Sequence, residues 1–168
     1  EAVEVPGCPG AWLVGLDMYG PNRVDFEKAL SGVPDGAFRV LLAHSPDVAP
    51  PAAELGIDLM LSGHTHGGQV CLPIIGPPVV PSSYGPRYAS GLLGVEGMRL
   101  FVTRGVGSDA NACRFRCPPE VAVLTLTRSD AAVSQGHIGV NLSRSGRQLV
   151  PLRRGVKQAL RGVREVEK

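Results

Sequence analysis

Aromatic and charged residues are both scarce in this chain of 168 residues. Only 5% of the residues are Phe, Trp or Tyr and 19% are charged, while 43% are hydrophobic. This composition excludes an intrinsically disordered chain, because such chains bury too little apolar surface to offset their conformational entropy. No run of about 18 apolar residues occurs, so the printed sequence predicts no membrane-spanning helix. The length suffices for one domain with a sizeable core.

Cysteines are few, and their spacing fits no zinc ribbon or zinc finger. They stand at positions 8, 71, 113 and 117, and the closest pair is C-x-x-x-C without a second pair. Free thiols in a reducing compartment are our first interpretation, with a disulfide or a metal role as alternatives. A starting Met is also absent, since the sequence begins with Glu1. We therefore expect a piece of a longer protein or a processed chain.

The net charge of +2 conceals an uneven distribution. Residues 144–168 contain eight Lys or Arg and two Glu, whereas residues 1–143 contain nine basic and thirteen acidic residues. We therefore divide the chain into a domain of residues 1–130 and a basic tail of residues 131–168. Within this tail, the apolar spacing over Leu152–Val166 predicts a marginal amphipathic helix.

Two interpretations of the basic tail remain open. A solvated helix would pack its apolar stripe on the domain, or the tail would contact anionic lipid, each basic residue contributing about 1 kcal/mol. A nucleic-acid partner is not expected, because no aromatic residue is interleaved with these charges. We accordingly expect a cytoplasmic protein, or one held peripherally on the cytoplasmic side of a membrane.

Short apolar runs alternate with helix signals along the first third of the chain. Buried strands are predicted at residues 11–16, 38–43 and 57–62, and a short helix at residues 25–30. Nearly continuous apolar strands separated by helices are typical of a sheet that is covered on both faces. The pattern therefore predicts the α/β fold class.

A second helix is predicted between the last two of these strands. Ser45 provides a cap, Pro46 suits the first turn, and Gly56 marks the end. The Pro50-Pro51 pair is expected to break this helix.

The following segments are less regular. Residues 72–94 are rich in Pro and Gly and lack periodicity, which predicts a long loop of the kind that is often functional. Two more strands are predicted at residues 98–103 and 121–127, with an irregular segment between them.

Three of the four histidines lie where predicted strands end. His44 follows the second strand, and His64 and His66 follow the third in the loop G-H-T-H-G-G-Q. Sites in α/β sheets form at the carboxyl ends of strands, and neutral imidazole is a common ligand of divalent transition metals. We therefore predict that these three imidazoles converge on a metal site. His137 lies in a polar segment and is interpreted as a surface residue.

A bare H-x-H is more often a solvated loop pair, but longer motifs accompany it here. The segments L-L-A-H-S-P-D and D-L-M-L-S-G-H-T-H-G-G-Q-V resemble the last two metal motifs of calcineurin-like metallophosphoesterases. The segments L-P-I-I-G, S-Y-G-P-R-Y-A-S-G, V-T-R-G-V-G and R-F-R-C-P-P-E-V-A-V-L-T-L resemble the branch of YkuE- and YaeI-like bacterial phosphodiesterases. The resemblance covers about Leu13 to Thr127.

The resemblance implies the C-terminal half of a four-layer αββα sandwich with mixed sheets. It also implies two divalent metal ions (Mn, Fe, Zn or Co), with His44 and His64 on one metal and His66 on the other. The family's remaining ligands lie in D-x-H, G-D and G-N-H-D/E motifs, none of which occurs here. The histidine usually assigned as proton donor is among them, so no catalytic residue is identified in this chain.

Three further residues are candidates near this site. Arg104 opens the R-G-V-G loop after a predicted strand, where its guanidinium would suit a substrate phosphate unless it is a plain surface residue. Asp47 would orient His44 or, as we favour, cap the following helix. Asp17 matches none of the missing motifs and is interpreted as structural or as supporting a ligand.

The function implied by the resemblance is metal-dependent hydrolysis of a phosphoester or phosphoanhydride at a two-metal, phosphodiesterase-type centre. By family analogy the substrate is lipid-linked or nucleotide-linked, such as UDP-diacylglucosamine. We expect negligible activity from these 168 residues alone. The alternatives are a degenerate non-catalytic relative and a zinc-stabilised structural or interaction module that uses Cys113, Cys117 and histidines.

Overall fold

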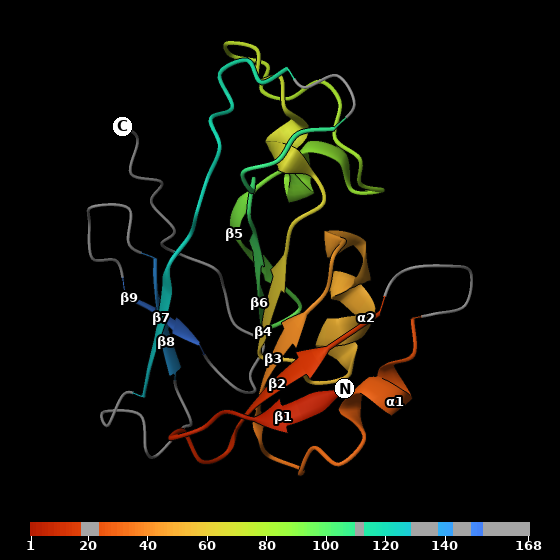
Figure 1. Ribbon diagram of the computed structural model, residues 1–168, viewed down its shortest axis with the longest axis vertical. Helices are drawn as coiled ribbons and strands as arrows, with labels where there is room; N and C mark the ends of the chain where they lie inside the picture. The colour runs from red at the N-terminus through yellow and green to blue at the C-terminus, as the bar shows by residue number, and fades with distance from the viewer. Residues whose placement is uncertain (18–23, 110–112, 129–137, 143–148, 153–168) are drawn as a thin grey trace.

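The centre of the computed structural model is a six-stranded mixed sheet (Figure 1). The structure describes residues 1–17, 24–109 and 113–128, together with strands at residues 138–142 and 149–152. The strand order is β1-β2-β3-β4-β6-β5, in which β2, β3, β4 and β6 run parallel. The predicted α/β class with a mixed sheet is therefore confirmed. The bounds are β1 Ala2–Glu4, β2 Ala11–Gly15, β3 Phe38–Leu42, β4 Leu59–Ser62, β5 Gly91–Val95 and β6 Met98–Val102.

The main core lies on one face of this sheet. Leu41, Met60 and Leu100 are fully buried there, in one cluster with residues of α1 (Phe26–Leu30) and α2 (Ala49–Glu54). Burial of each such side chain stabilises the fold by about 1.5–3 kcal/mol. The strands that contain these residues, β3, β4 and β6, are predicted from the sequence because their apolar runs are nearly continuous.

The opposite face of the sheet is also apolar but less fully covered. Val40 and Leu59 are buried there, and Leu124 of β7 (Leu124–Arg128) packs against them. Leu42, at the end of β3, is 40% exposed. Figure 1 shows α1 and α2 on one side of the sheet and β7 on the other.

A side-chain cap begins α1, whereas the Ser45 cap that the sequence indicates belongs to a 3-10 turn ahead of α2. Asp25 accepts a hydrogen bond from the Lys28 N–H at the start of α1. Ser45 caps the 3-10 turn η1 (Pro46–Val48), which leads directly into α2. The predicted break at Pro50-Pro51 is wrong, because both prolines lie in the first turn of α2. The N–H groups that prolines lack have no intrahelical partner in a first turn.

The predicted loop over residues 72–94 contains regular structure that the sequence analysis missed. A 3-10 turn, η3, spans Gly85–Tyr88, and β5 pairs antiparallel with β6 through a tight turn at Glu96 and Gly97. The two glycines of G-L-L-G-V concealed the strand pattern, because glycine is usually depleted in strands. Only the first part of the predicted loop is irregular.

The last strands form a separate three-stranded antiparallel sheet, in the order β7-β8-β9. β8 spans Ile138–Leu142 and β9 spans Leu149–Leu152. β7 begins three residues later than predicted, and Leu152 ends a strand where we expected the start of the tail helix. Its partner is Ile138 of β8, so tertiary pairing overrides the helical spacing. The rest of that predicted helix, and His137, lie outside the described residues.

Within the described part of the chain, the helices are too short and too polar to cross a lipid bilayer.

Candidate metal centre

The loop between β4 and the following segment has an unusual backbone. We call residues Gly63–Gln69 the histidine loop. His64, His66 and Gln69 adopt left-handed conformations, with φ of 67°, 52° and 58°. Each such non-glycine residue costs on the order of 1 kcal/mol, and strain of this kind persists where neighbouring contacts enforce it. The histidine loop is therefore held by its surroundings.

Thr65 and Gly67 account for much of this restraint. Thr65 is 1% exposed, and its hydroxyl donates a hydrogen bond of 2.7 Å to the Ala89 carbonyl. Gly67 has a φ of 66°, and a Cβ atom at this position would lie 2.7 Å from Cys117 Sγ and 2.9 Å from Arg104 Cγ. The loop thus packs too closely on its neighbours to accept a larger residue there.

His44 and His64 lie side by side at the carboxyl ends of β3 and β4. His44 Nε2 is 3.1 Å from His64 Nδ1, and the ring centroids are 4.8 Å apart. The parallel strands produce this proximity, because the Gly63 N–H donates to the His44 carbonyl at 3.1 Å. Burial and the adjacent His44 both lower the pKa of His64, which favours the neutral, metal-binding imidazole.

This pair fits the demands of a metal ion. Two nitrogens bound to one metal at about 2.0–2.1 Å lie about 2.8–3.4 Å apart, the shorter distances in octahedral and the longer in tetrahedral geometry. The observed separation of 3.1 Å falls in this range. An open cavity of about 360 Å³ adjoins the pair and is lined by His44, Ser62 and Thr103 among others. The buried Ser62 hydroxyl has no hydrogen-bond partner among the described residues.

His66 is held from the other side of the loop. Its Nδ1 lies 3.0 Å from the Gly107 carbonyl oxygen. A carbonyl only accepts, so Nδ1 carries the proton and Nε2 keeps a free lone pair. Metal-binding histidines usually have this arrangement, in which the second ring nitrogen donates to a carbonyl or carboxylate.

The structure thus brings two of the three predicted ligands, His44 and His64, into contact, and His66 lies near enough for its charge to lower the pKa of His64. In residues 1–17, 24–109 and 113–128, no three His, Cys, Asp or Glu side chains gather closely enough to form a metal-binding group. The convergence of all three imidazoles on one site is therefore not seen. The assignment of His44 and His64 to one metal and of His66 to another stays a prediction.

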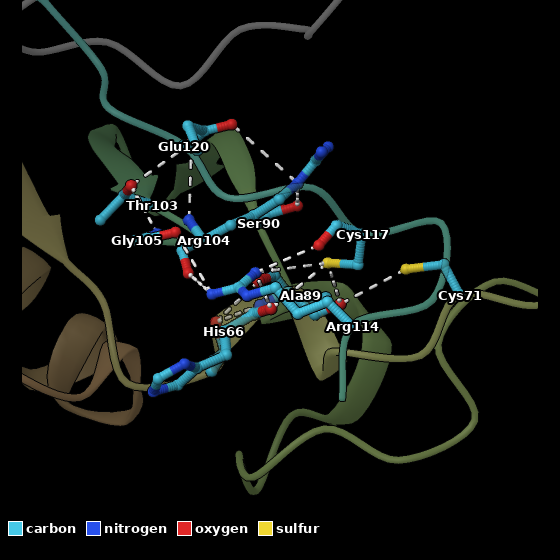
Figure 2. A network of polar contacts seen from close by, with 12 residues as sticks. His66, Cys71, Ala89, Ser90, Thr103, Arg104, Gly105, Arg114, Cys117 and Glu120 are labelled. Atoms are coloured by element: carbon cyan, nitrogen blue, oxygen red, sulfur yellow. Dashed lines mark hydrogen bonds and ion pairs between the residues drawn. The ribbon is translucent and has the colours of Figure 1, made fainter. Parts of the chain in front are cut away.

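Arg104 lies near the histidine loop but directs its guanidinium elsewhere. Its Nε donates to Ser90 Oγ at 3.3 Å and lies 4.0 Å from a Glu120 carboxylate oxygen. Figure 2 shows this guanidinium pointing away from the His66 ring. The structure does not place Arg104 with the histidines, so a contact with substrate phosphate stays a prediction.

Asp47 does not cap the helix, contrary to our expectation. The N-cap of α2 is Val48, which makes no side-chain cap hydrogen bond, and the Asp47 N–H donates to Ser45 Oγ at the start of η1. The Asp47 carboxylate accepts instead from Ser82 Oγ at 2.5 Å and from the Ser83 N–H at 2.8 Å. Burial opposes ionisation, but these hydrogen bonds outweigh it and lower the pKa of Asp47. The negative charge also acts on His64, where it favours the charged form.

The sequence analysis missed Arg114, which makes the densest contacts near the site (Figure 2). Its guanidinium donates to carbonyl oxygens of three chain segments. These are His66 at 3.3 Å, Arg104 at 2.8 Å, Gly105 at 3.2 Å, Cys117 at 3.2 Å, and Gly107 through both Nε and Nη2. The R-F-R-C-P-P-E motif contains this residue, but one arginine among neighbours carries no sequence signal of such a role.

All four cysteines are free thiols, as first interpreted. Cys117 is buried, and its thiol contacts the His66 carbonyl at 3.3 Å. Cys71 contacts the Gly67 carbonyl at 3.5 Å, and burial raises the pKa of its thiol. These contacts support the histidine loop by packing.

Comparison with known proteins places this arrangement in a family. The chain is 41% identical over 114 residues to the uncharacterized metallophosphoesterase YkuE of Bacillus subtilis, covering 68% of this chain. It is 43% identical over 88 residues to the phosphodiesterase YaeI of Escherichia coli, covering 52% of this chain. The chain is a metallophosphoesterase homologue. A further similar protein is the UDP-2,3-diacylglucosamine pyrophosphatase LpxG of Chlamydia trachomatis, 29% identical over 119 residues and 67% of this chain.

The chain spans less than half the length of these relatives. The matches cover 40% of YkuE, 32% of YaeI and 36% of LpxG. No family model and no solved structure matches the chain.

Proposed function

We propose that this chain forms part of a metal-dependent phosphoester hydrolase and contributes three ligands to a two-metal centre. His44 and His64 would hold one divalent ion and His66 the other. The observation that supports this most directly is the 3.1 Å separation of the His44 and His64 nitrogens at the sheet edge. Neutral nitrogen donors suit Mn, Fe, Zn or Co.

Two bound metals supply a hydroxide near neutral pH and neutralise charge that develops on the phosphoryl oxygens. The chain's own residues contribute the geometry. The sheet fixes the spacing of His44 and His64, and the Gly107 carbonyl fixes the tautomer of His66. The exposed His44 ring and the open cavity beside it leave access for a phosphoester.

We further propose that the remaining ligands come from a segment corresponding to the rest of the relatives' length. The D-x-H, G-D and G-N-H motifs are absent from this sequence. A centre with at most two ligands per metal binds weakly and lacks a proton donor. Hydrolysis by these residues alone should therefore be negligible.

A lipid-linked substrate is the finer form of this proposal. The neighbouring segment exposes apolar side chains, since Ile74 is 108%, Ile75 73% and Val79 74% exposed. This segment packs on the histidine loop, because a Cβ atom at Gly68 would lie 2.5 Å from Pro77 Cβ. Exposed isoleucines beside a phosphoester site suit an acyl chain or a bilayer surface. The name of LpxG, which specifies a diacylated nucleotide sugar, agrees with this preference.

Peripheral contact of residues 144–168 with anionic lipid would place the site near such a substrate. Most of these residues lie outside the described part of the structure, so the proposal rests on their eight basic residues.

Metal titration tests the central proposal. Isothermal titration of the metal-free chain with Zn²⁺ should show binding that is lost in His44→Ala and in His64→Ala. His137→Ala serves as the matched control and should bind as the unaltered chain does. Unchanged binding in a folded His44→Ala/His64→Ala double variant would reject the proposal. Loss of binding in Cys113→Ser/Cys117→Ser would instead favour the zinc-stabilised module.

A further inference from the structure

We propose that Arg114 is a positioning residue for the metal ligand His66 and acts through the Gly107 carbonyl. This role rests on the proposed function, in which His66 binds a metal. The Gly107 carbonyl oxygen receives hydrogen bonds from both side chains, one from the imidazole Nδ1–H of His66 and two from the guanidinium of Arg114, through Nε–H and Nη2–H. A carbonyl oxygen has two lone pairs, so it accepts from the imidazole at one while the two guanidinium N–H groups share the other.

The backbone around Arg114 fixes where its side chain starts. Phe115 pairs with the end of the histidine loop, since its N–H donates to the Gln69 carbonyl and its carbonyl accepts from the Cys71 N–H, each at 2.9 Å. This pairing holds Arg114 beside the loop. Arg116, two residues further on, is exposed. The two arginines of R-F-R therefore have different environments.

The chemistry of the guanidinium group suits its surroundings. The carbonyls of Arg104, Gly105 and Gly107 lie in an irregular loop outside the helices and strands, where Gly105 also accepts from the Glu120 N–H at 2.9 Å. Arginine offers five donors in a rigid fork, whereas lysine offers three on a flexible stem. Arg114 also binds the His66 carbonyl itself, so one group holds the backbone of the ligand and the acceptor of its ring.

The consequence for His66 concerns which of its two ring nitrogens carries the proton. Its backbone is left-handed, and its ring nitrogen Nδ1 has a carbonyl partner 3.0 Å away. If the Gly107 carbonyl rotated, the ring would lose the hydrogen bond that keeps the proton on Nδ1. Nε2 would then carry the proton for part of the time and could not bind a cation. Arg114 prevents this by holding that carbonyl in place.

Long-range ¹H–¹⁵N NMR of the histidine rings tests the proposal without any metal. At a pH well above about 6.5, the ordinary histidine pKa, His66 in the unaltered chain should show a protonated Nδ1 and a bare Nε2. In Arg114→Met and Arg114→Lys the His66 signals should become those of a tautomer mixture. A zinc titration is the second measurement. In both Arg114 variants the apparent affinity of Nε2 for added Zn²⁺ should fall by about 10–100-fold, as for other residues that orient metal ligands.

One variant serves as the matched control. Arg116→Met removes a neighbouring guanidinium that is exposed. It should keep the tautomer of the unaltered chain, whereas a merely structural loop contact would leave all three variants alike.

Several results would overturn the proposal. One is a protonated Nε2 on His66 in the unaltered chain, and another is an unchanged tautomer in a folded Arg114→Met variant. If neither Arg114 variant folds, hydrogen exchange of the Arg114 Nε–H in the unaltered chain decides, with slow exchange expected and rapid exchange contradicting the role. A tautomer shift without any zinc binding would support the positioning role and reject the proposed function.

Discussion

At the scale of single residues, the histidine loop is unusual because its backbone is left-handed at residues other than glycine. Two histidines occupy left-handed conformations, although glycine is the residue that adopts them without strain. The sequence motif G-H-T-H-G-G-Q identified the loop and its histidines. The left-handed φ values of His64 and His66 were not foreseen, because neighbouring contacts impose them.

Replacing His64 by glycine should raise stability while abolishing metal binding. The relief of left-handed strain exceeds the entropic cost of glycine, and we expect a gain of about 0.5–1 kcal/mol. His44→Gly is the matched control, because it breaks the same imidazole contact without relieving a left-handed φ. Urea denaturation measures both variants. A His64→Gly variant that is less stable than His44→Gly would contradict the strain argument.

Thr65→Val should destabilise the chain by about 1–3 kcal/mol. The substitution preserves shape but leaves the buried Ala89 carbonyl without the hydroxyl that donates to it at 2.7 Å. Thr127→Val in β7, where the side chain is exposed, should change the free energy of unfolding little. Equal midpoints of thermal unfolding for the two variants would show that the Thr65 hydrogen bond contributes nothing net.

At the scale of elements, strands were predictable where burial made their apolar runs continuous. Residues 38–43 and 57–62 gave clear strands, and β5 was missed because Gly91 and Gly94 interrupt its pattern. The sequence placed His44 and His64 correctly at strand ends. The sequence did not predict the Arg114 contacts, because the five carbonyl groups that accept from it lie in segments far apart in the chain and form no local sequence pattern.

Gly68→Ala should cost about 1–3 kcal/mol more than Gly76→Ala. The two glycines have nearly the same φ, 76° and 77°, so the conformational strain of alanine is alike at both. A Cβ atom would meet nothing within 4 Å at Gly76 but would lie 2.8 Å from the Val79 carbonyl oxygen at Gly68. Chemical denaturation compares them. Equal losses would mean that the segment after the histidine loop shifts freely.

Asp47 should make stability depend on pH in the acidic range. Its pKa in the folded chain is lowered by Ser82 and Ser83 against the opposing effect of burial. Its contribution is therefore fully present above the ordinary value of 3.8 and is lost as the pH falls through the lowered pKa. The stability difference between the unaltered chain and Asp47→Asn should shrink over that window. A difference that stays constant as the pH falls through that window would contradict this expectation.

At the scale of the whole molecule, the family resemblance and the sheet were predictable from the sequence, whereas the activity stays a proposal. The chain covers at most 40% of the three relatives described above, and only the last two of the motifs that the resemblance concerns occur in it. The pairing of β7 with β8 and β9 was not predicted, because it joins segments across a boundary that charge alone suggested. Charge distribution reports solvation and carries no information on strand pairing.

The purified chain should hydrolyse a generic phosphodiester no faster than buffer containing Mn²⁺. The physical reason is the shortage of ligands, since each metal would have one or two imidazoles and no bridging carboxylate. Release of nitrophenolate from a bis-nitrophenyl phosphate measures this. Robust turnover that His44→Ala abolishes would show that the described residues form a sufficient centre.

The hydrogen bond between Gly63 and the His44 carbonyl has a consequence for how such chains diverge. His44 and His64 are 20 positions apart, yet their spacing depends on the register of two adjacent strands. The intervening turn and helix can therefore lengthen, shorten or be exchanged among homologues without moving either imidazole. Insertions in this connection should be tolerated, whereas a shift of one residue in β4 would separate the pair.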